Sequence, residues 1–379
     1  VLYDILGDYD QALMVTNQAL EINLAKEKKV ENDSFAIATN YNNLGAFYYS
    51  RGDYDQAIDY YERSKALRAQ LGDPVETAFS ISNLALAFAA KGLQEKSLKL
   101  LGISDQVFSE VISTRGLDIR ANTYNFIARN ALANGNAGQA LSYAQKALSL
   151  LADNAINRFA SLQHIGNAYL QLGKYGLALD TLQLATASFS AIYGVNHPGL
   201  ADRYRMIAEV YNEIGQHDMA LQYCQKALKL LDETLDETNI YVNPDPGAGK
   251  GHLLELIQIL PTKANSLYAL YKKGEGQEKD LEFVYQTYQL TTDLIDRLRE
   301  AHLATGSKQF LIKQSKAIYE KGIALALQLN EKVPDSSYLD QAFVLAEKSK
   351  AILLAERLQD SEAKTTAEIP DSLLQTEAG

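Results

Sequence analysis

The chain has 379 residues, which is longer than a single-core domain usually is. Its 47% apolar and 22% charged residues are ordinary for a folded protein. A net charge of −11 argues against nucleic-acid binding, because no stripe of lysine and arginine overrides repulsion from phosphate. The single cysteine excludes an internal disulfide, and no run approaches the roughly 18 apolar residues of a membrane-spanning helix. We expect a cytoplasmic protein of several domains or a repeat array.

One pattern recurs within residues 1–238: an apolar helix, a glycine, a short polar turn, and then Ala-Leu or a close substitute. The turn glycines are Gly7, Gly52, Gly92, Gly135, Gly173 and Gly215. Their near-constant spacing predicts about six repeats, each a pair of helices. Because Val1 falls in the middle of a first helix, we expect a truncated first repeat and a chain cut from a longer one.

The recurring residue types explain how the helices pack. Glycine closes the first helix of each pair, where a left-handed backbone angle is needed. Small residues at the start of the second helix, and again seven positions later, let the two helices approach closely. They are Ala57 and Ser64, Ala140 and Ala147, Ala178 and Ala185, and Ala220 and Ala227. On the first helices the matching contacts are Leu44-Gly45, Leu84-Ala85, Ile127-Ala128, Ile165-Gly166 and Ile207-Ala208, while Tyr48, Phe88, Tyr169 and Tyr211 fill the space between helices.

These positions recur together in register and resemble the tetratricopeptide repeat. The period exceeds that family's usual ~34 residues, which indicates the longer helices of the variant typified by the kinesin light chain. The stretch from Tyr193 to Pro198 resembles the inter-repeat loop of that variant. The resemblance implies an all-α fold, a right-handed superhelical solenoid of antiparallel helix pairs.

One helix start has independent support. In the stretch Asp73-Pro74-Val75-Glu76, the aspartate can cap a helix and the proline is tolerated in its first turn. A glutamate three positions after the aspartate completes a capping box.

A loop follows the array at residues 239–251, which contain two prolines and three glycines. The alternative is a phosphate-binding loop at Gly247–Gly251. That motif needs a glycine where Pro244 stands and a serine or threonine where Gly251 stands, and it needs a preceding strand. We therefore predict an ordinary connection.

Helical periodicity resumes after the loop and predicts two further, degenerate helix pairs within residues 252–361. The four helices are expected at His252–Lys273, Lys279–His302, Ser307–Leu329 and Ser337–Ser361. Residues 362–379 are expected to form a linker toward a further domain.

Four segments of this region are distinctive: Leu294–Arg299, Ile318–Glu320, Tyr338–Ala351 and Ile369–Leu374. In this order and spacing they resemble the region upstream of the catalytic domain in bacterial CHAT-domain proteins, which are caspase-like cysteine peptidases preceded by tetratricopeptide repeats. The resemblance covers roughly residues 253–379 and implies a peptidase domain shortly after Gly379. Its catalytic histidine and cysteine correspond to no residue of this chain.

No pattern in the sequence predicts catalysis, a metal or a cofactor. Cys224 occupies a large-residue core position of its repeat, so we interpret it as a buried structural cysteine and not as a nucleophile. The histidines at positions 164, 197, 217, 252 and 302 lack metal-ligand spacing. We expect no enzyme activity within these residues.

A partner-binding surface is the remaining candidate site. In the repeat family, groove-facing positions stand at fixed offsets before the turn glycine, on one face of the first helix. Carried over, the candidates are Thr39, Asn42, Asn43, Tyr49, Asn83, Asn122, Asn125, Arg129, Gln163, His164, Asn167, Arg205, Glu209 and Asn212. Amide side chains can hold the backbone of an extended peptide. The alternative is that some of them only join neighbouring helices.

The leading hypothesis is a recognition arm that binds a peptide or protein partner and regulates a caspase-like peptidase. The first alternative is a self-standing adaptor that scaffolds a complex. The second is a peptide-sensing arm of a transcription regulator, which requires a DNA-binding domain outside these residues.

Overall fold

The structure is a computed structural model that describes residues 18, 21–22, 31–50, 53–110, 114–152, 158–245, 252–300, 305–334 and 337–350. Within these ranges all regular secondary structure is α-helical, which confirms the predicted fold class. The turn glycines Gly7 and Gly52, the stretch weighed as a phosphate-binding loop and the predicted linker at 362–379 lie outside the described residues.

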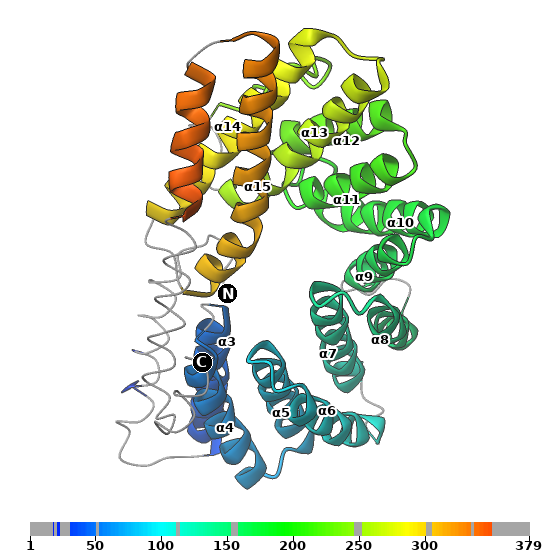
Figure 1. The fold of residues 1–379 in the computed structure, drawn as a ribbon. Helices are drawn as coiled ribbons and strands as arrows, with labels where there is room; N and C mark the ends of the chain where they lie inside the picture. The colour runs from blue at the N-terminus through cyan, green and yellow to red at the C-terminus, as the bar shows by residue number, and fades with distance from the viewer. Residues whose placement is uncertain are drawn as a thin grey trace. The chain divides into compact units, whose positions relative to one another are not determined.

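Ten consecutive helices within the described residues form five packed pairs (Figure 1). They are α3 (Glu31–Ser50) with α4 (Tyr54–Gln70), α5 (Pro74–Ala90) with α6 (Gln94–Ser109), α7 (Thr114–Ala133) with α8 (Ala137–Leu150), α9 (Arg158–Gln171) with α10 (Tyr175–Tyr193), and α11 (Leu200–Glu213) with α12 (His217–Leu231). The first helices of successive pairs also contact one another, α3 to α5, α5 to α7, α7 to α9 and α9 to α11. Helix pairs stacked in series are the architecture that the repeat predicts.

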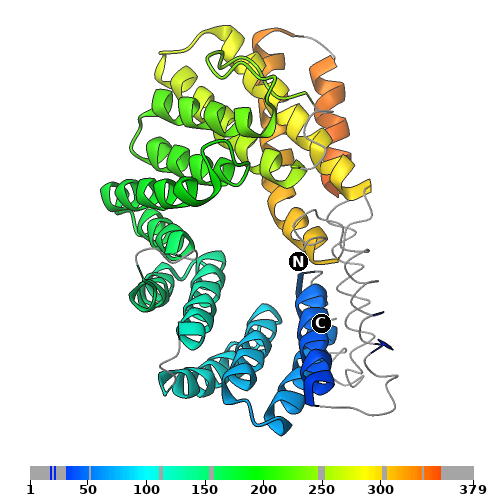
Figure 2. The same ribbon diagram turned by 180° about the vertical axis from the view of Figure 1, so that it is seen from behind.

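The chain divides into two compact units. The first comprises residues 1–255 and 304–306, and the second comprises 256–303 and 307–379. The second unit contains most of α13 (Leu253–Lys273), α14 (Glu278–Glu300), α15 (Thr305–Lys332) and a helix over the described residues 337–350 (Figure 2). The first three lie close to the predicted ranges, and the predicted end of the fourth at Ser361 lies outside the described residues. The helix at 337–350 joins α14 through a hydrogen bond from Tyr338 to Glu282 at 2.7 Å and an ion pair between Lys348 and Asp296 at 2.7 Å.

The predicted turn chemistry is confirmed where the structure describes it. Gly92, Gly135, Gly173 and Gly215 have φ angles of 84°, 73°, 70° and 79°. Each has its amide N–H bonded to a carbonyl of the last turn of the preceding helix, so glycine both ends the helix and redirects the chain.

The start of α5 keeps part of the predicted cap. The Asp73 carboxylate accepts a hydrogen bond from the amide of Glu76 at 3.0 Å, and Pro74 occupies the first helical turn. The Glu76 carboxylate pairs with Arg68 of α4 at 2.9 Å, and both side chains are almost fully buried. The glutamate of the predicted capping box therefore also ties the second helix of one repeat to the first helix of the next.

Helix approach within each pair depends on matched sizes at one position. The predicted small residues of the second helices, from Ala57 to Ala227, are all fully buried. On the first helix, a Cβ added to Gly45 would lie 2.6 Å from the ring of Tyr61, and one added to Gly166 would lie 2.6 Å from Leu182. In the α7–α8 pair the first helix has Ala128 and the equivalent facing position on the second helix is the small Ala144, whereas in the α5–α6 pair Ala85 stands opposite Leu101. In the two pairs that have glycine at this position, the glycine lies opposite a large residue.

This complementarity gives a stability prediction. Gly45→Ala should lower the free energy of unfolding by about 1–3 kcal/mol, because the new methyl group collides with the buried Tyr61 ring. Urea unfolding followed by circular dichroism measures the change. The matched control is Gly138→Ala on α8, where a Cβ meets nothing within 4 Å, and there better helix propensity should stabilise the protein by about 0.5–1 kcal/mol. Equal effects of the two substitutions would contradict the proposed close approach.

Candidate functional site

The predicted groove residues lie on the first helices α3, α5, α7, α9 and α11. Because these helices contact one another in series, side chains at equivalent positions can form one continuous surface. We describe this groove surface from α3 to α11, and it lies wholly within the first unit.

At the α3 end, two predicted asparagines bind each other. Asn83 donates from Nδ2 to Oδ1 of Asn42 at 2.8 Å, joining α3 to α5. Thr39 donates to the carbonyl of Phe35 in its own helix at 3.0 Å, while Asn43 is exposed. The Asn42–Asn83 pair therefore joins neighbouring helices, which is the alternative to binding a ligand.

On α7 the predicted residues have a different environment. Asn125 is only 6% exposed, yet neither its Nδ2 nor its Oδ1 has a hydrogen-bond partner among the described residues. Tyr49 of α3 packs against Phe126, with ring centroids 5.6 Å apart, and burial raises the pKa of its hydroxyl. Asn122, one turn before Asn125, is exposed. A buried amide without an internal partner is costly unless something else satisfies it.

A basic group surrounds His164 of α9, with Arg129 on α7 and Arg203 on α11. Arg129 is exposed and places its guanidinium 4.3 Å from the centre of the Phe126 ring. Burial first, and then the charges of Arg129 and Arg203, lower the pKa of His164 to about 4. Arg203 is itself 7% exposed and lies 3.9 Å above the Phe189 ring, and burial lowers its pKa to about 10. His164 is therefore neutral at pH 7, and the positive charge of this part of the surface belongs to the arginines.

Toward α11 the charges are paired internally. Arg205 donates to Asp202 at 2.6 Å and to Glu209 at 2.5 Å, and Gln163 of α9 donates to Asp202 at 3.4 Å. Burial disfavours the charge on Arg205, but Glu209 and Asp202 outweigh it and raise the pKa of the arginine. Burial raises the pKa of Glu209, although Arg205 opposes this shift. This network joins α9 to α11 and leaves Arg205 less available than the exposed Arg129.

The remaining predicted residues are Asn167, which is partly exposed, and Asn212, whose Oδ1 lies 3.0 Å from Nδ1 of His217. Sequence reasoning missed Phe126, Asp202 and Arg203. Asp202 could have been found, because it stands at the same offset before Gly215 as Thr39 does before its own turn glycine. Phe126 and Arg203 were missed because only polar residues at the family's groove offsets were considered.

The predicted buried cysteine is confirmed, since Cys224 is 0% exposed. Among the residues that the structure describes, no group of three histidine, cysteine or acidic side chains could hold a metal ion. The same described part of the chain contains no helix with the length and apolar character needed to span a membrane.

Comparison with known families fits this geometry. Residues 36–102 and 157–233 match the profile of the tetratricopeptide repeat. These two segments of the chain contain tetratricopeptide repeats. The unmatched stretch between them, residues 103–156, spans part of α6 and all of α7 and α8. This repeat fold is typically a non-catalytic scaffold that binds protein partners.

The sequence is similar to kinesin-light-chain-related proteins of Arabidopsis thaliana. It is 23% identical to Protein KINESIN LIGHT CHAIN-RELATED 1 over 296 residues, which are 77% of this chain and 45% of that protein. It is 24% identical to Protein KINESIN LIGHT CHAIN-RELATED 2 over 254 residues, 65% of this chain and 36% of that protein. The chain thus spans less than half the length of these relatives.

Three solved structures share the fold at low sequence identity. A signal transduction ATPase with a tetratricopeptide repeat sensor from Pyrococcus horikoshii has a TM-score of 0.57 and 16% identity, covering 87% of this chain and 45% of that one. Aspartyl phosphate phosphatase F from Bacillus subtilis has a TM-score of 0.53 and 14% identity, covering 86% and 74%. A Rap protein complexed with competence and sporulation factor has a TM-score of 0.51 and 15% identity, covering 93% and 87%.

The electrostatics of the basic group can be tested by titration. We expect the pKa of His164, followed by proton NMR of its ring, to lie near 4 and to rise in Arg129→Gln, because one opposing positive charge is removed. Since the folded-state pKa lies below the ordinary value of 6.5, the unfolded chain binds the proton first, and stability should fall as the pH drops from about 6.5 toward 4. Arg63→Gln on α4 is the control and should leave the His164 titration unchanged. A titration of His164 near 6.5 in the unaltered protein would refute the assigned environment.

Proposed function

We propose that the groove surface on α3, α5, α7, α9 and α11 binds an extended segment of a protein partner. The observation that carries this proposal is the exposure and hydrogen bonding of the side chains on α7. Asn122 and Arg129 are exposed on this helix, and the neighbouring Asn125 is buried without a hydrogen-bond partner among the described residues. A peptide backbone offers both the acceptor and the donor that an asparagine amide needs.

The other predicted residues differ along the surface in how available they are to a ligand. Where side chains already bind each other, as in Asn42–Asn83 and Arg205–Glu209, they stabilise the stacking of first helices. The exposed Asn43 and Asn122 and the partly exposed Asn167 are available to a ligand. A Rap protein of the same fold is complexed with competence and sporulation factor, so the fold can accommodate a bound partner. We place the centre of binding at α7 and α9.

The partner-binding prediction uses Arg129, which is exposed beside this centre. Peptides selected from a phage-displayed random library against the whole chain should bind Arg129→Glu at least about tenfold more weakly, which corresponds to about 1.4 kcal/mol. The charge reversal removes attraction and introduces repulsion beside Asn125. Isothermal titration calorimetry with a synthetic selected peptide measures the change.

The matched control is Lys99→Glu, a charge reversal at an exposed position of the second helix α6. It should leave peptide affinity within about twofold. Equal losses in both variants would indicate a general effect of net charge, and no loss in Arg129→Glu would remove α7 from the binding surface.

We further propose that this surface belongs to a cytoplasmic recognition arm that regulates a caspase-like peptidase. The support is the resemblance of residues 253–379 to the region upstream of such domains. In this proposal a bound partner is sensed by the array and transmitted through the helix that begins at Ser337, which the structure joins to α14.

The gene sequence beyond the codon for Gly379 tests this second proposal. We expect an αβ pattern carrying one histidine and one cysteine in the order of a caspase-like site. A stop codon soon after residue 379 would instead favour the self-standing adaptor. A helix-turn-helix domain elsewhere in the gene would favour the transcription regulator.

A further inference from the structure

One repeat lacks an aromatic ring that the others share. Four positions before the turn glycine, the chain has Tyr48, Phe88, Tyr169 and Tyr211, but the repeat formed by α7 and α8 has Ala131. Ala131 lies in the stretch 103–156 that the tetratricopeptide profile does not match. The structure shows what this replacement leaves behind.

In the two flanking repeats this ring packs against the second helix of the preceding pair, whereas Tyr48 and Tyr211 stack on Tyr60 and Tyr223 of their own pair's second helix. Phe88 packs in a cluster with α4, and Tyr169 packs in a cluster with α8. The covered residues lie five, six and nine positions after the preceding turn glycine, and they include Ala57, Ile58 and Tyr61 on α4 and Leu141 and Ala144 on α8. By the same register, the ring that would stand at position 131 should cover α6.

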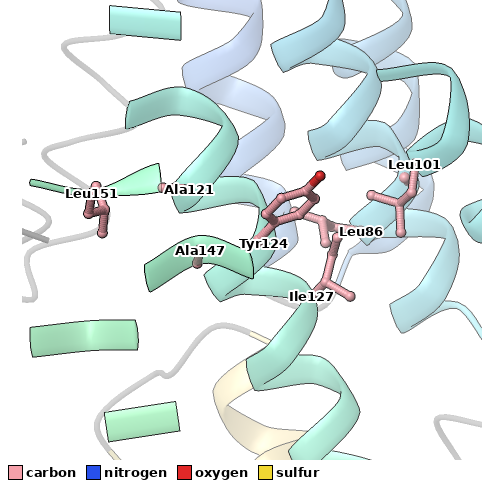
Figure 3. Close-up of a cluster of buried hydrophobic side chains, with 8 residues drawn as sticks. Leu86, Leu101, Ala121, Tyr124, Ile127, Ala147 and Leu151 are labelled. Carbon is pink, nitrogen blue, oxygen red and sulfur yellow. The ribbon is translucent and has the colours of Figure 1, made fainter. Parts of the chain in front are cut away.

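That surface of α6 is open. Its equivalent residues Ser97, Leu98 and Leu101 line a cavity of about 310 Å³, and Ala131 lines it from α7. Leu98 is 44% exposed, whereas Ile58 and Leu141, its counterparts in the neighbouring repeats, are partly buried. Figure 3 shows Leu101 close to Leu86 and Ile127, which also line the cavity. The cavity therefore occupies the place of the missing ring.

The lining indicates what could fill it. Every residue that lines the cavity is uncharged. The leucines, Ile127 and Ala131 form its apolar part, and four amide side chains form its polar part, Asn130, Asn134, Asn136 and Gln139. A second cavity of about 90 Å³ shares Leu98, Leu101 and Ile127, so the packing between α6 and α7 is loose along its length. An apolar cavity lowers stability, and a ligand that fills it recovers that loss.

We propose that this cavity binds a tyrosine side chain presented by a partner protein. The ring takes the position that Phe88 and Tyr169 occupy in their own repeats, and its hydroxyl exchanges hydrogen bonds with the amide side chains. Neutral lining disfavours a charged group, and the volume left by a missing aromatic side chain suits another aromatic side chain. The cavity is separate from the groove residues proposed above, so the two sites can be tested independently.

The test uses the whole chain and two defined probes, N-acetyltyrosinamide and N-acetylleucinamide, titrated by NMR. We expect saturable binding of the tyrosine probe, at least threefold tighter than that of the leucine probe. Ala131→Phe should weaken binding of the tyrosine probe more than tenfold, because it restores the ring that closes the cavity. Arg129→Glu should leave this binding unchanged, which separates the cavity from the groove surface.

A second variant covers the case in which the phenylalanine variant does not fold, as judged by circular dichroism. Ala131→Leu fills part of the same space and should weaken binding of the tyrosine probe about threefold or more. Absence of saturable binding to the unaltered chain would overturn the proposal. So would equal affinity for the two probes, or binding that survives both substitutions at position 131.

Discussion

The structure depends on how closely the two helices of each repeat approach. In two pairs a glycine of the first helix meets a large residue of the second, since Gly45 faces Tyr61 and Gly166 faces Leu182 with no room for a Cβ. Because interiors are close-packed, these contacts limit the spacing of the two pairs that have them. Stacking of pairs then brings the first helices α3 to α11 into contact in series, and they carry the surface proposed to bind a partner.

This dependence explains why the fold could be predicted from the sequence. Small residues and turn glycines act locally, and they recur at a near-constant spacing, so their pattern indicates both the helix pairs and the turns between them. Gly135 adopts the left-handed angle that its position requires, and Ala140 is fully buried as expected. The bounds of two helices after residue 252 were also predictable, because apolar periodicity alone places α13 and α14 within a few residues of their ends.

The candidate site was less predictable because it depends on contacts between repeats. Family offsets place Asn42 and Asn83 on the groove surface, but only the spatial register of α3 and α5 shows that they bind each other. The same is true of Arg205, whose charge is satisfied by Asp202 and Glu209. Offsets along one helix predict which way a side chain projects. They do not predict whether a neighbouring repeat already satisfies its hydrogen bonds or its charge, and that decides whether it is available to a ligand.

Helix α7 has the least complete internal hydrogen bonding and packing among the described first helices. Asn125 has no partner within the described residues, Arg129 is exposed, and Ala131 leaves the cavity against α6 open. At about 100° per residue, positions 129 and 131 point to nearly opposite sides of the helix. One helix therefore offers a charged and amide surface on one side and an uncharged cavity of mixed apolar and amide lining on the other. A partner that used both would contact α7 on two opposite sides. Its binding would also stabilise the packing between α6 and α7, because a ligand that fills the cavity stabilises the folded array.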